Sequence, residues 1–244
     1  MMMAKKTITF FLLILTVTFL MKDFISLKIS QFLFLDLNLN LPAKKILLFS
    51  NYPIIFLESE KNFTLARIYF IEGRLYEALD KINQSIDVKP EIAEYYYLRG
   101  LIKGFLGGVQ IYTATDDFQK YIDLSLKQLE KPGLWAGYND LAWVYFLLGN
   151  FKKSEEISKE ALNFSPNNPW LLNMLGSSLI EQNKCEEAKK YLSIAEYYAK
   201  NITVDEFGQA YSGDSKKWWP KGLDAMKKTI SENLKICENL STPK

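Results

Sequence analysis

The chain has 244 residues, a formal net charge of +2, no histidine, 48% hydrophobic residues and 14% aromatic residues. Its hydrophobic content excludes an intrinsically disordered chain, and its small net charge gives no reason to expect a nucleic-acid partner. Because histidine is the commonest general base and zinc ligand, its absence leads us to expect neither a metal site nor a cofactor.

The N-terminal segment has the composition of a targeting sequence. Lys5 and Lys6 precede residues 7–21, fifteen residues without a charge, and no A-x-A-like cleavage site follows. Residues 1–35 are therefore interpreted as an uncleaved signal anchor with its flank, which places residues 1–6 in the cytoplasm and the rest of the chain outside it. One alternative is a cleaved signal peptide that releases a periplasmic or secreted protein. The other is a buried N-terminal helix of a cytosolic protein.

Residues 36–58 are predicted to be a linker and an N-terminal cap. The leucines between Leu35 and Leu41 alternate with polar residues, a period typical of a strand. An isolated strand would have no partner in a helical chain, so a linker or irregular helix is expected instead. Pro42 is then expected to open a short helix that ends near Asn51.

Residues 135–200 contain a pattern that repeats after 34 positions. The matching pairs are Leu141 and Leu175, Ala142 and Gly176, Tyr145 and Leu179, Gly149 and Asn183, Phe151 and Cys185, and Ala161 and Ala195. A fixed period near 34 predicts helix–turn–helix units that stack into a solenoid. In each unit a glycine suits the end of the first helix, and small residues allow the helices to approach closely.

This pattern resembles the tetratricopeptide repeat. A frame that begins at Ser59 gives Leu65, Ala66, Tyr69, Gly73, Leu75, Ala78, Ile82, Ser85 and Pro90 at the family's positions. Further repeats begin at Ala93, Trp135 and Pro169, and two extra residues in the second bring Ala114, Phe118 and Tyr121 into frame. The resemblance covers residues 59–200. It implies an all-α, right-handed solenoid of about four helix pairs, with an N-terminal hydrophobic helix and a C-terminal capping helix.

In the tetratricopeptide repeat family, fixed positions of each first helix line a groove that binds a protein or peptide. The residues that the resemblance assigns to this groove are Phe63, Arg67, Phe70, Tyr97, Leu101, Asn139, Trp143, Phe146 and Asn173. We expect them to bind an unidentified partner by apolar contact more than by charge. The alternative is that several of them pack within the array or against the N-terminal segment.

Residues 201–244 are predicted to be a linker and a C-terminal capping helix. From Pro220 onward, an apolar stripe runs from Leu223 to Cys237 at helical spacing, as a cap over the last repeat requires. Trp218 and Trp219 stand among lysines, which indicates either a membrane-interface contact or packing into the cap.

The chain contains two cysteines, Cys185 and Cys237. Cys185 falls at an apolar position of the last repeat and is interpreted as a small buried side chain. The alternative is a disulfide with Cys237, which suits an exported protein.

Two carboxylate pairs, Asp116–Asp117 and Glu155–Glu156, are the candidates for acid–base chemistry. Adjacent helical residues point apart, so both pairs are interpreted as solvated. No catalytic residue is predicted, and the chain is not expected to be an enzyme. The predicted function is a membrane-anchored interaction scaffold outside the cytoplasm, and the alternative is a soluble peptide-binding protein released from its signal peptide.

Overall fold

The computed structural model describes residues 21, 22, 24–37, 39–49, 55–127, 133–210 and 219–241. These residues form helices and connecting turns and contain no strand, so the predicted all-α fold is confirmed. The predicted membrane anchor, residues 7–21, lies outside the described residues except for Met21. Within the described part of the chain, no helix combines the length and the apolarity needed to cross a membrane. The chain divides into two compact units, residues 1–90 and residues 91–244.

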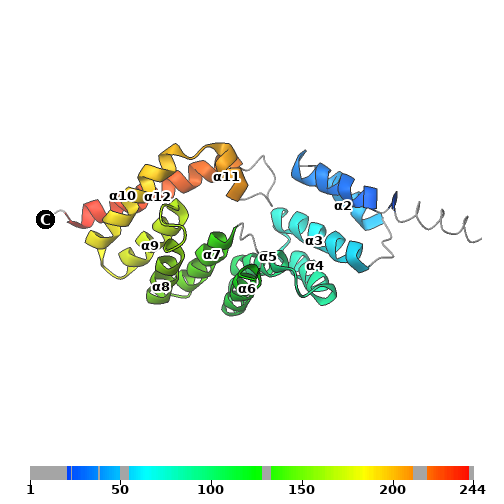
Figure 1. The fold of residues 1–244 in the computed structure, drawn as a ribbon, viewed down its shortest axis with the longest axis horizontal. Helices are drawn as coiled ribbons and strands as arrows, with labels where there is room; N and C mark the ends of the chain where they lie inside the picture. The colour runs from blue at the N-terminus through cyan, green and yellow to red at the C-terminus, as the bar shows by residue number, and fades with distance from the viewer. Residues whose placement is uncertain are drawn as a thin grey trace, which may run out of the picture. The chain divides into compact units, whose positions relative to one another are not determined.

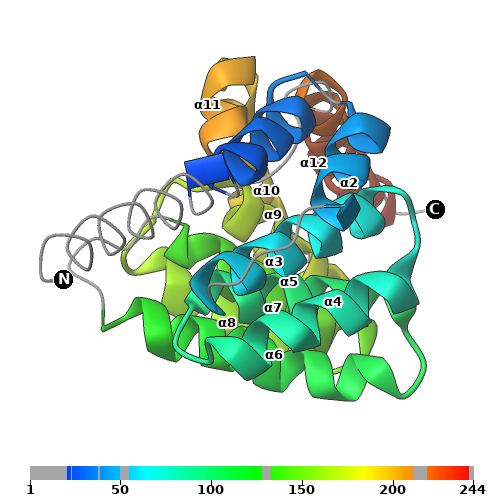
Figure 2. The ribbon, with the colours of Figure 1, turned by 90° about the vertical axis from the view of Figure 1, so that its right-hand side faces the viewer.

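The first unit contains a helix at residues 24–35, followed by α2 (Asn40–Phe49), α3 (Ile55–Ile71) and α4 (Leu75–Val88). α3 and α4 form the first predicted helix pair, and the helices before them pack on α3 (Figure 2). The short helix expected from Pro42 is present as α2, although it begins two residues earlier, at Asn40. Residues 36 and 37 form a turn, so the leucine alternation reflects a helix–turn–helix connection and not a strand.

The second unit contains three further helix pairs and the C-terminal segment (Figure 1). The pairs are α5 (Ala93–Leu106) with α6 (Gln110–Ser125), α7 (Leu134–Leu147) with α8 (Phe151–Leu162), and α9 (Pro169–Glu181) with α10 (Cys185–Asn201). From α5 to α10 each helix packs against the next one along the chain, which is the stacking that the 34-residue period predicts. α11 (Val204–Ala210) and α12 (Trp219–Ser241) follow, and α11 was not expected from the sequence.

The turn inside each repeat has the backbone that the sequence predicts. Gly149 has a φ of 73°, and Asn183, its counterpart in the next repeat, has a φ of 59°. The amide N–H of the following residue donates a 2.9 Å hydrogen bond back into the first helix in both repeats, from Asn150 to Tyr145 and from Lys184 to Leu179. Glycine and asparagine tolerate this left-handed conformation best, so local backbone chemistry determines where the first helix ends.

Small residues bring the two helices of a repeat together. A Cβ atom added to Gly176 would lie 2.5 Å from Cγ of Leu192, so no larger residue fits in α9 at that point. Ala188, at the start of α10, is fully buried. The expected close approach of the helices at these positions is therefore confirmed.

The C-terminal helix α12 covers the last repeat. Its buried residues Ile230 and Cys237 enter two apolar clusters formed by α9 and α10. Cys237 forms a disulfide with Cys185 across 5.1 Å between the Cα atoms, so the disulfide alternative is the one that the structure shows. Trp219 packs against Gly208 of α11, in agreement with packing into the cap, whereas Trp218 lies outside the described residues.

Candidate partner-binding surface

The predicted groove residues come from the first helix of each repeat, α3, α5, α7 and α9, and we call the side of each helix that carries them its first-helix face. The face is divided between the two units of the chain, because α3 belongs to the first unit and the other three helices belong to the second. The assignment of partner-binding residues stays a prediction. The structure does show how each part of the face is packed.

In the first unit, the N-terminal helix at residues 24–35 lies against the first-helix face of α3. The guanidinium of Arg67 lies 5.3 Å from the ring centroid of Phe34 and 5.7 Å from that of Phe63. Gln31 donates a 3.5 Å hydrogen bond to the hydroxyl of Thr64, and Phe34 is fully buried. The chain's own N-terminal helix thus contacts the face at Arg67, which is the alternative considered from the sequence.

In the fourth repeat, the C-terminal segment lies against the first-helix face of α9. The amide of Asn233 in α12 donates 2.9 Å hydrogen bonds to Oδ1 of Asn173 and to Oγ of Ser177. One helical turn before Asn173, the ring of Trp170 lies 5.7 Å from that of Phe207 in α11. Asn173 therefore already bonds to another part of the same chain.

The middle of the array, α5 and α7, presents apolar side chains on the same face. The rings of Phe105 in α5 and Trp143 in α7 lie 5.5 Å apart, although 60% of the surface of Phe105 is exposed. Leu101 precedes Phe105 by four residues and Leu147 follows Trp143 by four, so each pair shares one side of its helix. We call these four residues the apolar strip. Its exposed members are Phe105 and Leu147.

A polar cluster stands beside the apolar strip, nearer the N-terminal ends of α5 and α7. The Tyr97 hydroxyl donates a 2.6 Å hydrogen bond to Asp140, and the amide of Asn139 donates another of 3.1 Å to the same carboxylate. Tyr121, whose ring lies 5.0 Å from that of Tyr97, also senses this carboxylate. Burial raises the pKa of the Tyr121 phenol, a hydrogen bond with Ser125 lowers it, and the negative charge of Asp140 raises it further. Tyr97 and Asn139 are thus held in place by one carboxylate that bridges two repeats.

The two remaining aromatic residues of the predicted site are partly buried. Phe146 packs edge-on against Phe151 of α8 at 5.2 Å, and Phe70 is half-buried in α3. Trp143 is also engaged on its inner side, because a Cβ atom on Gly104 would lie only 2.7 Å from its ring. Trp143 therefore has two roles: it packs against Gly104 inside the array, and it forms part of the apolar strip beside Phe105.

The sequence of residues 136–168, which covers most of α7, all of α8 and the turn before α9, matches the family model described as the tetratricopeptide repeat. Residues 136–168 form a tetratricopeptide repeat. For these residues the match confirms the resemblance proposed from the sequence. None of the curated proteins matches the chain.

Several solved structures share the tetratricopeptide-repeat fold of this chain at low sequence identity. PilW, a widely conserved type IV pilus biogenesis factor, aligns with a TM-score of 0.58 and 14% identity over 86% of this chain and 90% of its own. MamA of strain AMB-1 gives 0.57 and 17% over 79% and 96%. A thermophilic tetratricopeptide-repeat protein of Thermus thermophilus gives 0.55 and 17% over 78% and 97%. At such identities the likeness concerns the fold alone.

The second repeat contains a buried ion cluster that the sequence interpretation missed. Asp117 of α6 is only 3% exposed and pairs with Arg99 at 2.6 Å and with Lys103 at 2.7 Å, both from α5. Asp116, by contrast, is exposed. The two aspartates point apart as expected, but the expectation that both are solvated is wrong for Asp117. The sequence did contain a signal for this cluster, because Arg99 stands where the other repeats have leucine and Lys103 where they have tyrosine or leucine.

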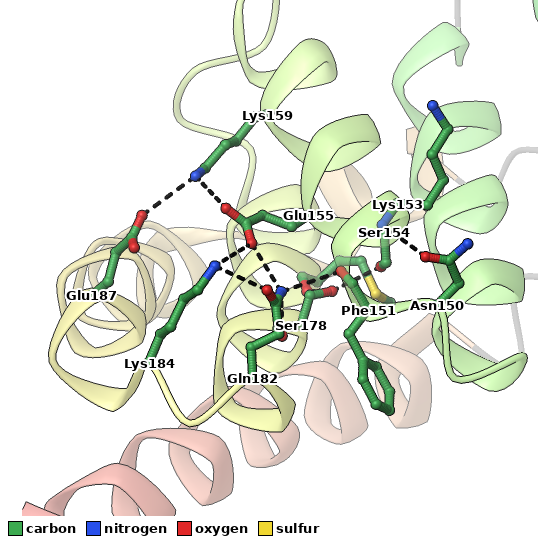
Figure 3. A network of polar contacts seen from close by, with 11 residues as sticks. Asn150, Phe151, Lys153, Ser154, Glu155, Lys159, Ser178, Gln182, Lys184 and Glu187 are labelled. Atoms are coloured by element: carbon green, nitrogen blue, oxygen red, sulfur yellow. Dashed lines mark hydrogen bonds and ion pairs between the residues drawn. The ribbon is translucent and has the colours of Figure 1, made fainter.

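The other carboxylate pair, Glu155–Glu156, also has one member within a polar network and one exposed member. The network lies at the junction of the third and fourth repeats (Figure 3). Glu155 accepts hydrogen bonds from Lys159 at 2.5 Å, Gln182 at 2.8 Å and Lys184 at 3.0 Å. Burial alone would raise the pKa of Glu155, but these three hydrogen bonds outweigh it and lower the pKa to about 2. Glu156 is exposed. The network around Glu155 therefore joins α8 to the end of α9, and the interpretation of this residue as solvated is wrong.

Buried hydroxyls continue the junction beneath Glu155. Ser178 of α9 donates a 2.7 Å hydrogen bond to Ser154 of α8, and both residues are buried (Figure 3). Ser154 occupies the small-residue position of its tetratricopeptide repeat, where the other repeats have alanine. Among the residues that the structure describes, no group of three or more Cys, Asp or Glu side chains could hold a metal ion.

Proposed function

We propose that this chain is a non-catalytic interaction scaffold that binds a segment of a partner protein on the apolar strip of its second and third repeats. Leu101, Phe105, Trp143 and Leu147 supply the contact surface. Tetratricopeptide repeats and other solenoids use the inner surfaces of their stacked helices to bind extended partners. The proposal places the binding energy in apolar contact, as the composition of the strip requires.

The observation that carries the proposal is the exposure of Phe105 beside Trp143. A phenylalanine that packs at a tilt against a tryptophan and still leaves 60% of its surface exposed offers a preformed aromatic anchor point. The end repeats differ, because Arg67 contacts the chain's own Phe34 and Asn173 contacts its own Asn233. The middle repeats are therefore the part of the first-helix face that supports partner binding best.

We place the repeats outside the cytoplasm, held at a membrane by residues 7–21. The disulfide between Cys185 and Cys237 supports this location, since disulfides persist in oxidising compartments and are rare in the cytoplasm. Lys5 and Lys6 before the apolar run support the same orientation. The second candidate is a soluble periplasmic or secreted protein released from its signal peptide, and the disulfide suits it equally.

A photo-crosslinking amino acid placed at Phe105 of the full-length chain in its native host tests the binding surface. We expect one discrete crosslinked partner from position 105, and none from the control position Tyr112. Tyr112 is 66% exposed and lies on the second helix of the same repeat. Equal crosslinking from both positions, or none from Phe105 and Leu147, would overturn the proposed surface. Phe105 is a better probe than Trp143, whose replacement also removes packing against Gly104.

The location is tested separately by fusing a reporter that works only in the cytoplasm after Lys244. We expect no reporter activity, and we expect the protein to remain in the membrane after a carbonate wash. An active reporter would refute the proposed orientation. A mature N-terminus found beyond residue 21 would favour the released, soluble form.

A further inference from the structure

The exposed apolar side chains of the described residues are concentrated near the N-terminus. Of twenty large apolar side chains that are exposed, nine lie within residues 21–48. Exposed apolar residues scattered singly need no explanation, whereas a concentration on one segment marks an interaction surface. The first unit therefore has a concentration of exposed apolar side chains of its own, in addition to the apolar strip of the second unit.

The helix at residues 24–35 has two apolar faces on opposite sides. Leu27 and Phe34 are buried on the side that packs on α3. On the opposite side Ile25, Ile29 and Phe32 are each about half exposed, at spacings of four and three residues that align them along the helix. One face of this helix thus packs against the first unit, and the opposite face presents a stripe of exposed apolar side chains.

The next helix, α2, repeats this arrangement. Ala43 and Leu47 are fully buried, while Leu41 and Leu48 are exposed on the opposite side. Lys45 lies exposed between the two leucines along the chain. Two consecutive helices therefore each bury one side in the first unit and expose apolar residues on the other.

Positive charge accompanies these exposed faces. Residues 21–49 contain four lysines, at positions 22, 28, 44 and 45, against two aspartates, at positions 23 and 36. Lys44 is held by Glu72 at 2.7 Å, whereas Lys22, Lys28 and Lys45 are exposed. Exposed apolar side chains flanked by lysines have the chemistry of a helix that lies in the interface of an anionic membrane.

The sequence before this helix indicates what covers it. The uncharged run of residues 7–21 ends where the stripe begins, at Met21. Fifteen helical residues span about 22 Å, less than the roughly 30 Å hydrocarbon core of a bilayer. A membrane segment of that length would leave the following helix close to the headgroups.

We infer that the outward face of residues 21–35, formed by Ile25, Ile29 and Phe32, lies in the headgroup region of an anionic membrane surface, with α2 contributing Leu41 and Leu48. This inference rests on the proposed membrane anchoring. It adds that the helix at residues 24–35 and α2 contact the bilayer surface and thereby hold the first helix pair, α3 and α4, close to the membrane.

Fluorescence quenching in vesicles tests the inference. The full-length chain with Phe32→Cys is labelled with an environment-sensitive fluorophore and reconstituted in vesicles of phosphatidylcholine and phosphatidylglycerol. The native cysteines stay in their disulfide. The control is Tyr76→Cys, a position on α4 of the same unit that is 74% exposed. We expect the label at position 32 to shift to the blue and to lose most of its emission to headgroup-quencher lipids, and the label at position 76 to stay unchanged.

The outcomes separate this inference from the anchoring on which it rests. Vesicles that carry the protein but leave the label at position 32 unquenched overturn the inference and leave the anchoring in place. A protein that does not float with the vesicles overturns the anchoring itself. Equal quenching in vesicles without phosphatidylglycerol overturns the need for anionic lipid. Crosslinking between Phe32→Cys chains without lipid quenching shows that a second copy covers the stripe, which also overturns the inference.

Discussion

The side-chain amide of Asn233 in α12 donates a 2.9 Å hydrogen bond to Oδ1 of Asn173 in α9, across sixty residues of sequence. Asn173 is a position where the repeat resemblance predicts a contact with a partner. The C-terminal helix therefore does more than cover the end of the apolar core, because it also bonds to the first-helix face of the last repeat. The disulfide between Cys185 and Cys237 fixes the same helix to α10.

Loss of this disulfide is expected to destabilise the fourth repeat. The cysteines are 52 residues apart, and a crosslink over a loop of that length stabilises a fold by roughly 4 kcal/mol through the entropy of the unfolded chain. We expect Cys185→Ser with Cys237→Ser to lower the melting temperature. The wild type should fall to the same value in reductant, whereas the double variant should not respond to reductant. A wild-type melting curve that reductant leaves unchanged would contradict the prediction.

The buried ion cluster of the second repeat should be far more sensitive than its neighbouring surface charge. Asp117→Asn leaves Arg99 and Lys103 without their carboxylate, and breaking a buried ion pair costs roughly 3 kcal/mol or more. Asp116→Asn is the matched control because Asp116 is exposed on the same helix. Chemical denaturation should show a large loss of unfolding free energy for the first variant and almost none for the second. Equal losses would mean that the cluster does not stabilise the fold.

The tight contact between helices predicts an asymmetric response to added volume. Ala188 is fully buried at the start of α10, and overpacking such a site costs roughly 1–3 kcal/mol. Ala188→Leu is therefore expected to lower the melting temperature by several degrees. Lys189→Leu changes the next residue, which is only half-buried, and should have a small effect. Similar melting temperatures for the two variants would count against the repeat register.

The network around Glu155 predicts a dependence of stability on acid. The pKa of Glu155 is lowered from 4.5 to about 2 in the folded chain, so its ionised form favours the folded state. This contribution is complete above the unfolded value of 4.5 and is lost as the pH falls from about 4.5 toward 2. Glu155→Gln should reduce the pH dependence of unfolding in that window. Glu156→Gln, an exposed neighbour, should leave it unchanged, and an identical pH profile for both variants would refute the assignment.

The features that the sequence determined by itself are local ones. Gly149 and Asn183 end their helices because the left-handed backbone is a property of a single residue and its nearest neighbours. The small residues Gly176 and Ala188 mark the close approach of helices because their spacing repeats with the period of the fold. The all-α class, the four helix pairs and the starts of α5, α7 and α9 to within one residue follow from these local signals, whereas α3 begins at Ile55, four residues before the predicted start at Ser59.

Tertiary structure decided which of the predicted surface positions remain accessible. Asp116 and Asp117 are identical in type and adjacent in sequence, yet only Asp117 is buried, because the cations that pair with it come from another helix. Arg67 and Asn173 are both predicted groove positions, but Phe34 and Asn233, distant in sequence, contact them. Burial depends on what packs on a face, and that contact is formed between segments whose separation no local pattern records.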